Sequence, residues 1–204
     1  GLNHFIFPLG FKKKFFEKFF YSKKNVIKYK FNILKKNFLT KDLKSNKINI
    51  SIFDAGQKTK KLERIFKSLH YVVNNDFIVA YGDDLSNIKL NQILKEYNKN
   101  KNKKAIVTIF NKKSQYGHVV VGKKKFVKQF IEKPLHQYPI NIGNYFFSKN
   151  LFKKYRKTGH ELENNFLPIL AKKKLLLSYE HKGYFYSIND KKELIIAQTK
   201  LKKK

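Results

Sequence analysis

Two adjacent carboxylates, Asp83 and Asp84, follow directly on the short apolar run Phe77–Ala80 and the dipeptide Tyr81-Gly82. A run of this kind, rich in Ile and Val, predicts a strand buried on both faces. In open α/β sheets, ligands bind beyond the carboxyl ends of the strands. An acid there could hold Mg²⁺ against a phosphate, because Mg²⁺ is usually bound by one or two carboxylates together with phosphate oxygens. The alternative is an Asp-rich turn whose acids cap the following segment.

The strand before these acids is expected to lie in a parallel sheet. The hydrophobic pattern predicts strands and helices in alternation: a strand over 48–53, a helix over 60–71, the strand over 77–80 and a helix over 90–98. This order is typical of strands joined by right-handed helical crossovers. The polar turn after Asp54 ends at Thr59, which we expect to cap the helix over 60–71. The predicted fold is therefore α/β.

Three further segments complete the prediction. A helix is expected over 12–21, where Phe15, Phe16, Phe19 and Phe20 share one face, a pattern typical of core packing. The lysine-rich segment 25–47 is expected to hold edge strands and loop. Residues 116–121 and 125–131 predict a hairpin around Gly122, which Pro134 ends because proline cannot continue a ladder.

The composition is dominated by lysine. The 204 residues carry a formal net charge of +32, and among the 46 basic residues only Arg64 and Arg156 are arginine. A charge of this size raises the possibility of a nucleic-acid partner. Arginine, however, supplies the fork that reads guanine edges and phosphates, and the lysines run from Lys12 to Lys204. We therefore favour a solvated lysine surface over a specific nucleic-acid site, and a basic nucleic-acid-binding domain stays as an alternative.

Other features of the composition limit the class of protein. The chain has no cysteine, which excludes a disulfide framework and thiolate metal ligands. No signal peptide and no apolar run long enough to span a bilayer is present, so we expect a cytoplasmic protein without a membrane partner. Its length suits a single domain over 1–204. The chain begins at Gly1, contains no methionine and opens on a predicted strand, so we expect that the true amino terminus is missing.

The order of short motifs resembles the sugar-phosphate nucleotidyltransferases, and among them the cytidylyltransferases that act on glucose 1-phosphate. The motifs lie in order along nearly the whole chain: 5–20, Asp54-Ala-Gly with Thr59 and Arg64-Ile65, Tyr81-Gly82-Asp83, Gln115-Tyr116-Gly117, 130–134, 140–143, 163–170 and 181–185. No one of them is specific alone. Their shared order is what carries the resemblance.

The resemblance implies a fold and an activity. The fold would be a three-layer, Rossmann-like α/β domain with a mixed, mostly parallel sheet flanked by helices. The activity would join a nucleoside triphosphate, CTP by this resemblance, to glucose 1-phosphate and release pyrophosphate, in the synthesis of nucleotide sugars for polysaccharides. The cofactor would be Mg²⁺. The partners would be the nucleoside triphosphate and the sugar 1-phosphate, and the protein would assemble as a homo-oligomer. Such phosphoryl chemistry depends mainly on aligning anions and neutralising their charge.

By the same resemblance, site residues are assigned by role. Asp83 would be a catalytic residue and Mg²⁺ ligand, with Asn189 in the place of the family's second metal-binding aspartate. Lys133 would be catalytic by binding the sugar phosphate. The substrate-binding residues would be Thr59 near the nucleotide, with Gly117, Asn141, Gly143 and Glu163 around the sugar. Three of these residues have simpler interpretations. Lys133 could be an ordinary surface lysine, and Asn141 could be a turn residue. Glu163 could be an acid in the first turn of a helix, where the helix dipole favours it.

The chain also departs from the family pattern. Nothing before Phe5 resembles the Gly-rich loop that cradles the triphosphate, so we expect the first strand and that loop to be missing. Lys60-Lys61 stand where the subfamily shows two glycines. Asn189 is neutral and binds Mg²⁺ more weakly than a carboxylate, and Asp190 could substitute for it only with a shift of register. These departures keep open a catalytically inactive homologue that acts as a binding or regulatory protein.

Overall fold

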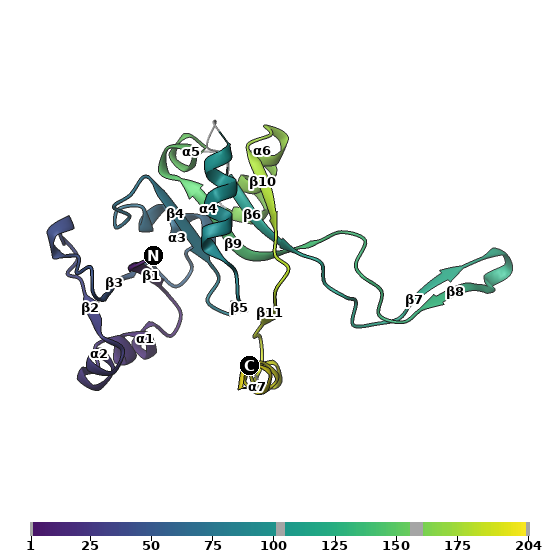
Figure 1. The fold of residues 1–204 in the computed structure, drawn as a ribbon, viewed down its shortest axis with the longest axis horizontal. Helices are drawn as coiled ribbons and strands as arrows, with labels where there is room; N and C mark the ends of the chain where they lie inside the picture. Colours follow the sequence, from purple (N-terminus) through teal and green to yellow (C-terminus); the bar gives the residue numbers. More distant parts are fainter. Residues whose placement is uncertain (1, 101–104, 156–160, 203–204) are drawn as a thin grey trace. The chain divides into compact units, whose positions relative to one another are not determined.

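A computed structural model describes residues 2–100, 105–155 and 161–202, and these fold into sheets flanked by helices (Figure 1). The predicted α/β class is confirmed. The chain divides into two compact units, each built from segments that are distant in sequence. Unit 1 comprises Gly1–Phe77 and Ser148–Lys173, and unit 2 comprises Ile78–Phe147 and Lys174–Lys204. The assignment of 1–204 to a single domain stays a prediction.

Unit 1 is organised around a parallel sheet of three strands. The order is β1 (His4–Leu9), β3 (Ile48–Asp54), β2 (Phe31–Ile33), and both neighbours run parallel to β3. The β1–β3 register runs from His4 opposite Asn49 to Leu9 opposite Asp54, so the two strands end together. This shared end positions the loop that begins at Asp54.

The helices of unit 1 are short. They are α1 (Lys13–Phe20), α2 (Lys23–Tyr29), the 3-10 turn η1 (Thr40–Asp42), α3 (Lys61–Ser68), α5 (Lys149–Lys154), the π-helical turn η4 (Leu162–Phe166) and α6 (Leu167–Lys172). Phe152 of α5 is fully buried and packs on Phe66 and Phe166, with ring centroids 4.5 and 4.6 Å away. This aromatic contact joins α3, α5 and η4 into one core.

Unit 2 contains a mixed sheet of four strands. The order is β10 (Leu176–Glu180), β6 (Ala105–Phe110), β9 (Ile140–Ser148), β4 (Asp76–Ala80). β10 and β6 are parallel, whereas β6 and β9 are antiparallel. Helix α4 (Leu90–Lys99) packs on this sheet because Ile93 and Tyr97 form a buried cluster with Ile106 and Phe146.

Two small ladders and one helix complete unit 2 (Figure 1). β5 (Asp84–Ser86) pairs antiparallel with β11 (Phe185–Ser187), and the helix α7 (Lys191–Lys202) follows β11. β7 (His118–Val121) and β8 (Val127–Ile131) form an antiparallel hairpin with the 3-10 turn η2 (Lys123–Lys125) at its tip. Every residue of β7 and β8 is exposed.

Several predictions about the elements are confirmed and others are wrong. The strands β3 and β4, the helix α4 and the hairpin lie where the sequence predicts them. β4 is only partly buried along its length, not buried on both faces. The lysine-rich segment includes a helix, α2, that was not predicted. In α1 only Phe20 is buried, while Phe15, Phe16 and Phe19 are exposed, so the predicted core face is wrong for three of four rings.

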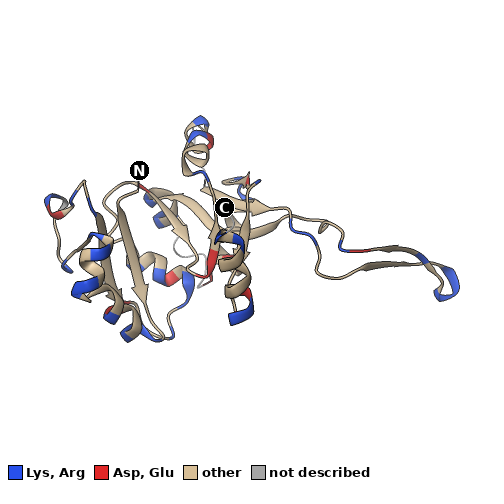
Figure 2. Ribbon diagram, turned by 60° about the horizontal axis from the view of Figure 1, so that its bottom comes forward, with Lys and Arg blue, Asp and Glu red and all other residues tan. Residues whose placement is uncertain are grey.

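The basic residues are distributed over helices, turns and loops, while the strands carry few of them (Figure 2). In the described part of the chain, they lie on many separate helices, turns and loops and are not confined to one element, as Figure 2 shows. The distribution is that of a lysine-rich surface. None of the described helices is both long enough and apolar enough to span a bilayer.

Candidate functional site

The end of β4 lies against β9 at one close backbone contact. The N–H of Tyr81 donates to the carbonyl of Gly143 at 3.1 Å. Gly143 has φ +68°, a conformation that glycine adopts without the steric cost that other residues bear. A Cβ on Gly143 would lie 2.5 Å from the Tyr81 ring and 2.7 Å from Asp84 Oδ2. Glycine is therefore required here by both its backbone and its surroundings.

A chain of polar groups lies beside this contact. Asn141 Nδ2 donates to the Tyr145 hydroxyl at 2.6 Å, and the hydroxyls of Tyr145 and Tyr81 lie 3.2 Å apart. Asn141 Oδ1 accepts the N–H of Gly143 at 3.0 Å, which holds the turn that Gly143 makes. Because Tyr145 is buried, its hydroxyl is a fixed partner that holds the Asn141 side chain in place. Asn141 thus has a structural role in shaping Gly143, whatever it does for a ligand.

The two candidate metal ligands lie just outside the two strands of the β5–β11 ladder. Asp84 is opposite Ser187 in the β5–β11 ladder, and the N–H of Ile188 donates to the carbonyl of Asp83 at 2.8 Å. Asn189 is the next residue after Ile188, so this pairing brings it alongside the Gly82-Asp83 turn. Both side chains belong to exposed residues. The ladder therefore joins two candidates that are 106 positions apart in the chain.

The hydrogen bonds of Asn189 show which of its atoms could face a cation. Its Nδ2 donates to Glu193 Oε2 at 3.1 Å and to Ser187 Oγ at 3.4 Å, and its backbone N–H donates to Glu193 Oε2 at 2.7 Å. The amide nitrogen is therefore engaged, and the side-chain carbonyl oxygen is the atom of Asn189 that could bind a cation. Asp190 does not substitute for Asn189, because Asp190 Oδ1 accepts the N–H of Glu193 at 2.8 Å and caps α7.

This donor set fits Mg²⁺ and fits softer metals less well. It offers one carboxylate and one amide oxygen, and Mg²⁺ commonly takes few protein ligands and fills its shell with water and phosphate oxygens. Over residues 2–100, 105–155 and 161–202, no three Asp, Glu, His or Cys side chains are grouped closely enough to hold a metal by themselves. A cation at this place would depend on substrate phosphates for the rest of its shell.

The hairpin brings together two other predicted site residues. His118 lies opposite Ile131 at the end of the ladder, and Gly117 and Glu132 are the residues just beyond this pair, with Lys133 after Glu132. A Cβ on Gly117 would lie 2.5 Å from the Phe130 ring and 3.0 Å from Glu132 Oε2. Lys133 has φ +46° and its Nζ lies 3.5 Å from Glu132 Oε1. The strained backbone at Lys133 projects an exposed ammonium from the base of the hairpin.

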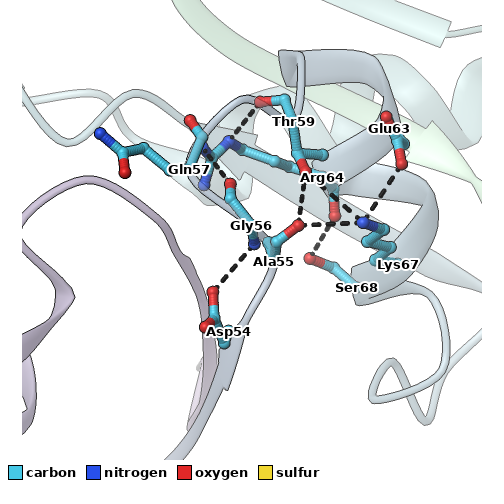
Figure 3. Close-up of polar contacts among 9 residues, drawn as sticks. All are labelled: Asp54, Ala55, Gly56, Gln57, Thr59, Glu63, Arg64, Lys67 and Ser68. Atoms are coloured by element: carbon cyan, nitrogen blue, oxygen red, sulfur yellow. Dashed lines mark hydrogen bonds and ion pairs between the residues drawn. The ribbon is translucent and has the colours of Figure 1, made fainter.

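In unit 1, the loop after β3 is held by the guanidinium of Arg64 (Figure 3). Arg64 donates to the carbonyls of Thr59, Gly56 and Gln57 at 2.9, 3.0 and 3.3 Å. It also donates to the carbonyl of Pro8 in β1 at 3.1 Å. Four backbone acceptors converge on one side chain, because the planar guanidinium presents five N–H donors in a fixed fork. Arg64 is thus the clamp of the loop 54–59.

Thr59 belongs to this clamp and does not cap α3. Its hydroxyl donates to the carbonyl of Ala55 at 2.5 Å, and Lys67 Nζ donates to the same carbonyl at 2.9 Å (Figure 3). The residue that precedes α3 is Lys60, which makes no side-chain cap. The prediction that Thr59 caps the helix over 60–71 is therefore wrong. The competing bond to Ala55 bends the loop back on itself.

The two lysines that replace the family's glycines have ion-pair partners. Lys60 Nζ lies 2.5 Å from Glu161 Oε1, and Lys61 pairs with Glu163 at the first turn of η4. The hydrogen bond from Lys60, followed by that from Asn164, lowers the pKa of Glu161 below its ordinary value. These contacts join the loop 54–59 to η4, so Thr59 and Glu163 lie in one region of unit 1.

The carboxylate that opens the loop is also charged and paired. Asp54 accepts a hydrogen bond from Lys13 of α1 and another from the N–H of Gly56 at 2.9 Å. The Lys13 bond, then the Gly56 bond, lowers the pKa of Asp54 below its ordinary value. The same pairing raises the pKa of Lys13.

The structure thus gathers the predicted site residues into groups. In unit 2, Asn141 contacts Gly143 directly, the residue before Asn189 is bonded to Asp83, and Gly117 and Lys133 flank the open end of the hairpin. In unit 1, Glu163 pairs with Lys61, two residues after Thr59. The residues that sequence reasoning missed are supporting ones: Tyr145, Lys67 and Glu193, with Arg64 cited only as part of a motif. Spacing gave a weak signal for one of them, since Glu193 lies three residues after Asp190 as in a capping box.

A family model described as "Nucleotidyl transferase" matches residues 23–203 of this chain. A protein of Bacillus subtilis (strain 168), named "Probable glucose-1-phosphate cytidylyltransferase", is 30% identical over 205 residues. That alignment covers 96% of this chain and 76% of the relative. The match extends across both units.

Solved structures show the same fold at lower identity. UDP-glucose pyrophosphorylase complexed with UDP-glucose has a TM-score of 0.63 at 22% identity, covering 99% of this chain and 82% of its own. HddC from Yersinia pseudotuberculosis has a TM-score of 0.62 at 19% identity, covering 98% of this chain and 80% of its own. These likenesses support the architecture and leave the substrates to be argued from the site.

Proposed function

The chain belongs to the nucleotidyl transferase family, and on that premise we propose that it joins CTP to glucose 1-phosphate, giving CDP-glucose and pyrophosphate. The choice of nucleotide and sugar is supported by the B. subtilis relative, whose name specifies a glucose-1-phosphate cytidylyltransferase. In this reaction a phosphate oxygen of the sugar phosphate attacks the α-phosphorus of CTP. The bond from that phosphorus to the bridging oxygen breaks, and pyrophosphate leaves with the electron pair.

The observation that supports the proposal is the backbone contact beside the β5–β11 ladder, in which the N–H of Ile188, the residue before Asn189, donates to the carbonyl of Asp83. Asp83, through its carboxylate, and Asn189, through its amide oxygen, would hold Mg²⁺ there. When bound, the cation would supply charge neutralisation for the phosphates. The protein contributes alignment, since the hydrogen bonds from Asn189 to Glu193 orient the amide before any ligand arrives.

The sugar phosphate is assigned to the hairpin and to β9. Lys133 would bind the phosphate as a point charge, from a backbone held at φ +46°. Gly117 and Gly143 are assigned to the sugar pocket as main-chain positions, and the space that a Cβ would take at each is filled by the ring of Phe130 or of Tyr81. Asn141, fixed by Tyr145 and Gly143, would present its remaining hydrogen-bonding capacity to the sugar.

Thr59 and Glu163 are assigned to substrate binding in unit 1. Thr59 would act through the shape of the clamped loop, because its hydroxyl already donates to Ala55. Glu163 would accept hydrogen bonds from sugar hydroxyls at the carboxylate that Lys61 also contacts.

The test is pyrophosphate release from the full chain with glucose 1-phosphate, Mg²⁺ and each of CTP, UTP, GTP and dTTP in turn. We expect release with CTP above the other three, and loss of release when a chelator removes Mg²⁺. Release with another nucleotide and not with CTP would reject the choice of base. Substituting mannose 1-phosphate or galactose 1-phosphate tests the sugar in the same assay.

A second candidate, a homologue that binds substrate without turning it over, is favoured by the neutral Asn189. It predicts no pyrophosphate release with any nucleotide, together with CTP binding in a calorimetric titration. The substitution Asn189→Asp separates the two candidates. If activity appears or rises, the catalytic assignment stands, and if it stays near zero while binding persists, the binding protein is the correct assignment.

A further inference from the structure

Helices α1 and α2 carry an aromatic face that the proposed function does not use. Its members are Phe15, Phe16, Phe19, Tyr21 and Tyr29, which we refer to as the α1–α2 face. Phe15 is 71% exposed, Phe16 48% and Phe19 43%, although each ring is large and apolar. The sequence pattern predicts that such rings enter the core, and only Phe20 does. The exposure of the others therefore needs an explanation.

The face has a fixed shape. Asn25 Nδ2 donates to the carbonyl of Phe19 at 2.9 Å and ties α2 to the end of α1. The rings of Phe19 and Tyr29 lie 5.9 Å apart, and Tyr29 stacks on Phe31 at 5.6 Å. Between the helices runs an open groove of about 580 Å³, lined by Phe15, Lys18, Phe19, Tyr21, Ser22 and Asn25. The aromatic side chains are thus held in place by α2 and β2.

Lysines surround the aromatic rings on the same two helices. Residues 11–30 contain eight lysines and one acid, Glu17, and of these lysines Lys13 is paired with Asp54. Lys12 lies over the Phe11 ring at 5.3 Å and Lys28 over the Tyr29 ring at 5.1 Å. The face therefore combines exposed apolar rings with a positive charge that has almost no acidic counterpart nearby.

We propose that the α1–α2 face binds the surface of an anionic lipid bilayer. A basic amphipathic helix with aromatic side chains inserts its apolar side at the boundary between headgroups and acyl chains, while its lysines contact anionic headgroups. Charge complementarity selects an anionic occupant, and the phenylalanine rings select one with an apolar interior. A nucleic acid would satisfy the charge, but it offers no apolar layer for Ile27, which is 77% exposed on α2.

This inference departs from the sequence-based expectation of no membrane partner. That expectation rested on the lack of a segment long enough to span a bilayer, and a helix pair that lies on the surface needs none. The inference does not depend on the proposed enzymatic function, because lipid binding is measured without nucleotide or sugar phosphate.

The absence of tryptophan from the sequence makes a clean optical test possible. The variant Phe15→Trp reports on the α1–α2 face, and Phe126→Trp reports on the tip of the hairpin, where Phe126 is 73% exposed and follows three lysines. With phosphatidylglycerol vesicles, we expect a blue shift of the Phe15→Trp emission and none for Phe126→Trp. With phosphatidylcholine vesicles, we expect no shift for either variant.

Paired charge and ring variants test the same inference by vesicle sedimentation. Lys14→Glu with Lys18→Glu, and Lys123→Glu with Lys128→Glu, change the net charge equally, but only the first pair lies on α1. We expect the first pair to weaken partitioning roughly tenfold or more, and the second pair to have a small effect. Phe15→Ser should weaken partitioning to a similar degree, while Phe126→Ser should not. Thermal melting of Phe15→Ser checks that the fold is intact.

Three outcomes would overturn the proposal. One is an equal blue shift from Phe126→Trp, which would make the binding a general property of a basic chain. Another is an equal weakening of vesicle partitioning by both pairs of lysine substitutions. The third is no blue shift of Phe15→Trp on phosphatidylglycerol vesicles together with a change in its emission on a short single-stranded DNA, which would assign the face to a nucleic acid.

Discussion

The backbone N–H of Tyr81 donates to the carbonyl of Gly143 at 3.1 Å, and the Tyr81 ring stands 2.5 Å from the place that a Cβ on Gly143 would occupy. The strand that ends in the candidate metal-binding acids is thereby fixed to the strand that carries Asn141. Because the ring and the backbone of one residue meet a single glycine, a small change at position 143 should affect both strands.

The substitution Gly143→Ala tests this contact. A side chain at φ +68°, with the Tyr81 ring and Asp84 Oδ2 in its way, should lower the free energy of unfolding by about 1–3 kcal/mol. The matched control is Gly82→Ala, since a Cβ there would meet nothing within 4 Å. Denaturant unfolding of both variants gives the comparison, and equal effects would contradict the assigned role of Gly143.

Replacement of Arg64 should release the loop 54–59. Arg64→Lys keeps the charge but removes the fork that reaches four carbonyls, so we expect a loss of about 2 kcal/mol. Hydrogen exchange at the amides of Gly56 and Thr59 should accelerate in the variant. Lys67→Met is the control, because it removes a bond to the Ala55 carbonyl and leaves the Arg64 bonds in place. Unchanged protection in Arg64→Lys would show that the loop is held by other contacts.

Asn189→Asp should strengthen divalent cation binding next to Asp83. A second carboxylate in place of an amide adds a unit of negative charge to the site, and we expect Mn²⁺ affinity to rise roughly tenfold. Titration followed by electron paramagnetic resonance measures this directly. Asp190→Asn should leave the affinity unchanged and cost about 1 kcal/mol or less of stability, since Asp190 caps α7. A rise in Mn²⁺ affinity that survives Asp83→Asn would place the cation elsewhere.

Glu163 and Glu161 form a matched pair of ion-paired acids. Each contacts a neighbouring lysine of the segment 60–61, but only Glu163 is assigned to the sugar. Glu163→Gln should raise the KM for glucose 1-phosphate roughly tenfold, because a carboxylate accepts hydrogen bonds more strongly than an amide. Glu161→Gln should leave the KM near the wild-type value. Equal effects of the two variants would indicate a structural role for both.

The pairing of Asp54 with Lys13 should appear in the pH dependence of stability. The pKa of Asp54 is lowered from the ordinary 3.8, so its contribution is present above that value and is lost as the pH falls through the folded-state pKa below it. The pKa of Lys13 is raised from the ordinary 10.5, so its contribution is present below that value and is lost at higher pH. Asp54→Asn should lower the melting temperature between these limits and make the acid limb shallower. Lys13→Met should do the same, and the double variant should add little.

The fold class could be predicted from the sequence because hydrophobic periodicity and element order survive in the structure. Periodicity states which residues share a face, but not whether another element covers that face, so Phe15 and Phe19 were assigned to a core they do not enter. The helix α2 was missed because Asn25, Val26 and Ile27 have modest helix propensity. Its contact with α1, through the rings of Tyr29 and Phe19, joins residues that are not neighbours in the sequence.

The site was only partly predictable, because its geometry depends on pairing between distant segments. Spacing alone does not show that the segment before Asn189 pairs with the segment around Asp83, and the β5–β11 ladder does. The order of motifs identifies Thr59 as a candidate site residue. It does not reveal the hydrogen bond from Thr59 to Ala55, which prevents Thr59 from capping α3. The sequence marks Lys60 and Lys61 as departures from two glycines, whereas their partners Glu161 and Glu163 are seen only in the structure.

The division of the chain has a consequence for its synthesis on the ribosome. Unit 1 opens with Gly1–Phe77 and is completed only by Ser148–Lys173, after most of unit 2 has been made. When the parallel strands β1, β2 and β3 have been synthesised, roughly seventy further residues must be added before α5 and α6 can pack on them. Nascent segments with uncovered apolar surface are prone to aggregate. Slow translation before Ser148 should accordingly reduce the yield of folded protein more than slow translation after Lys173.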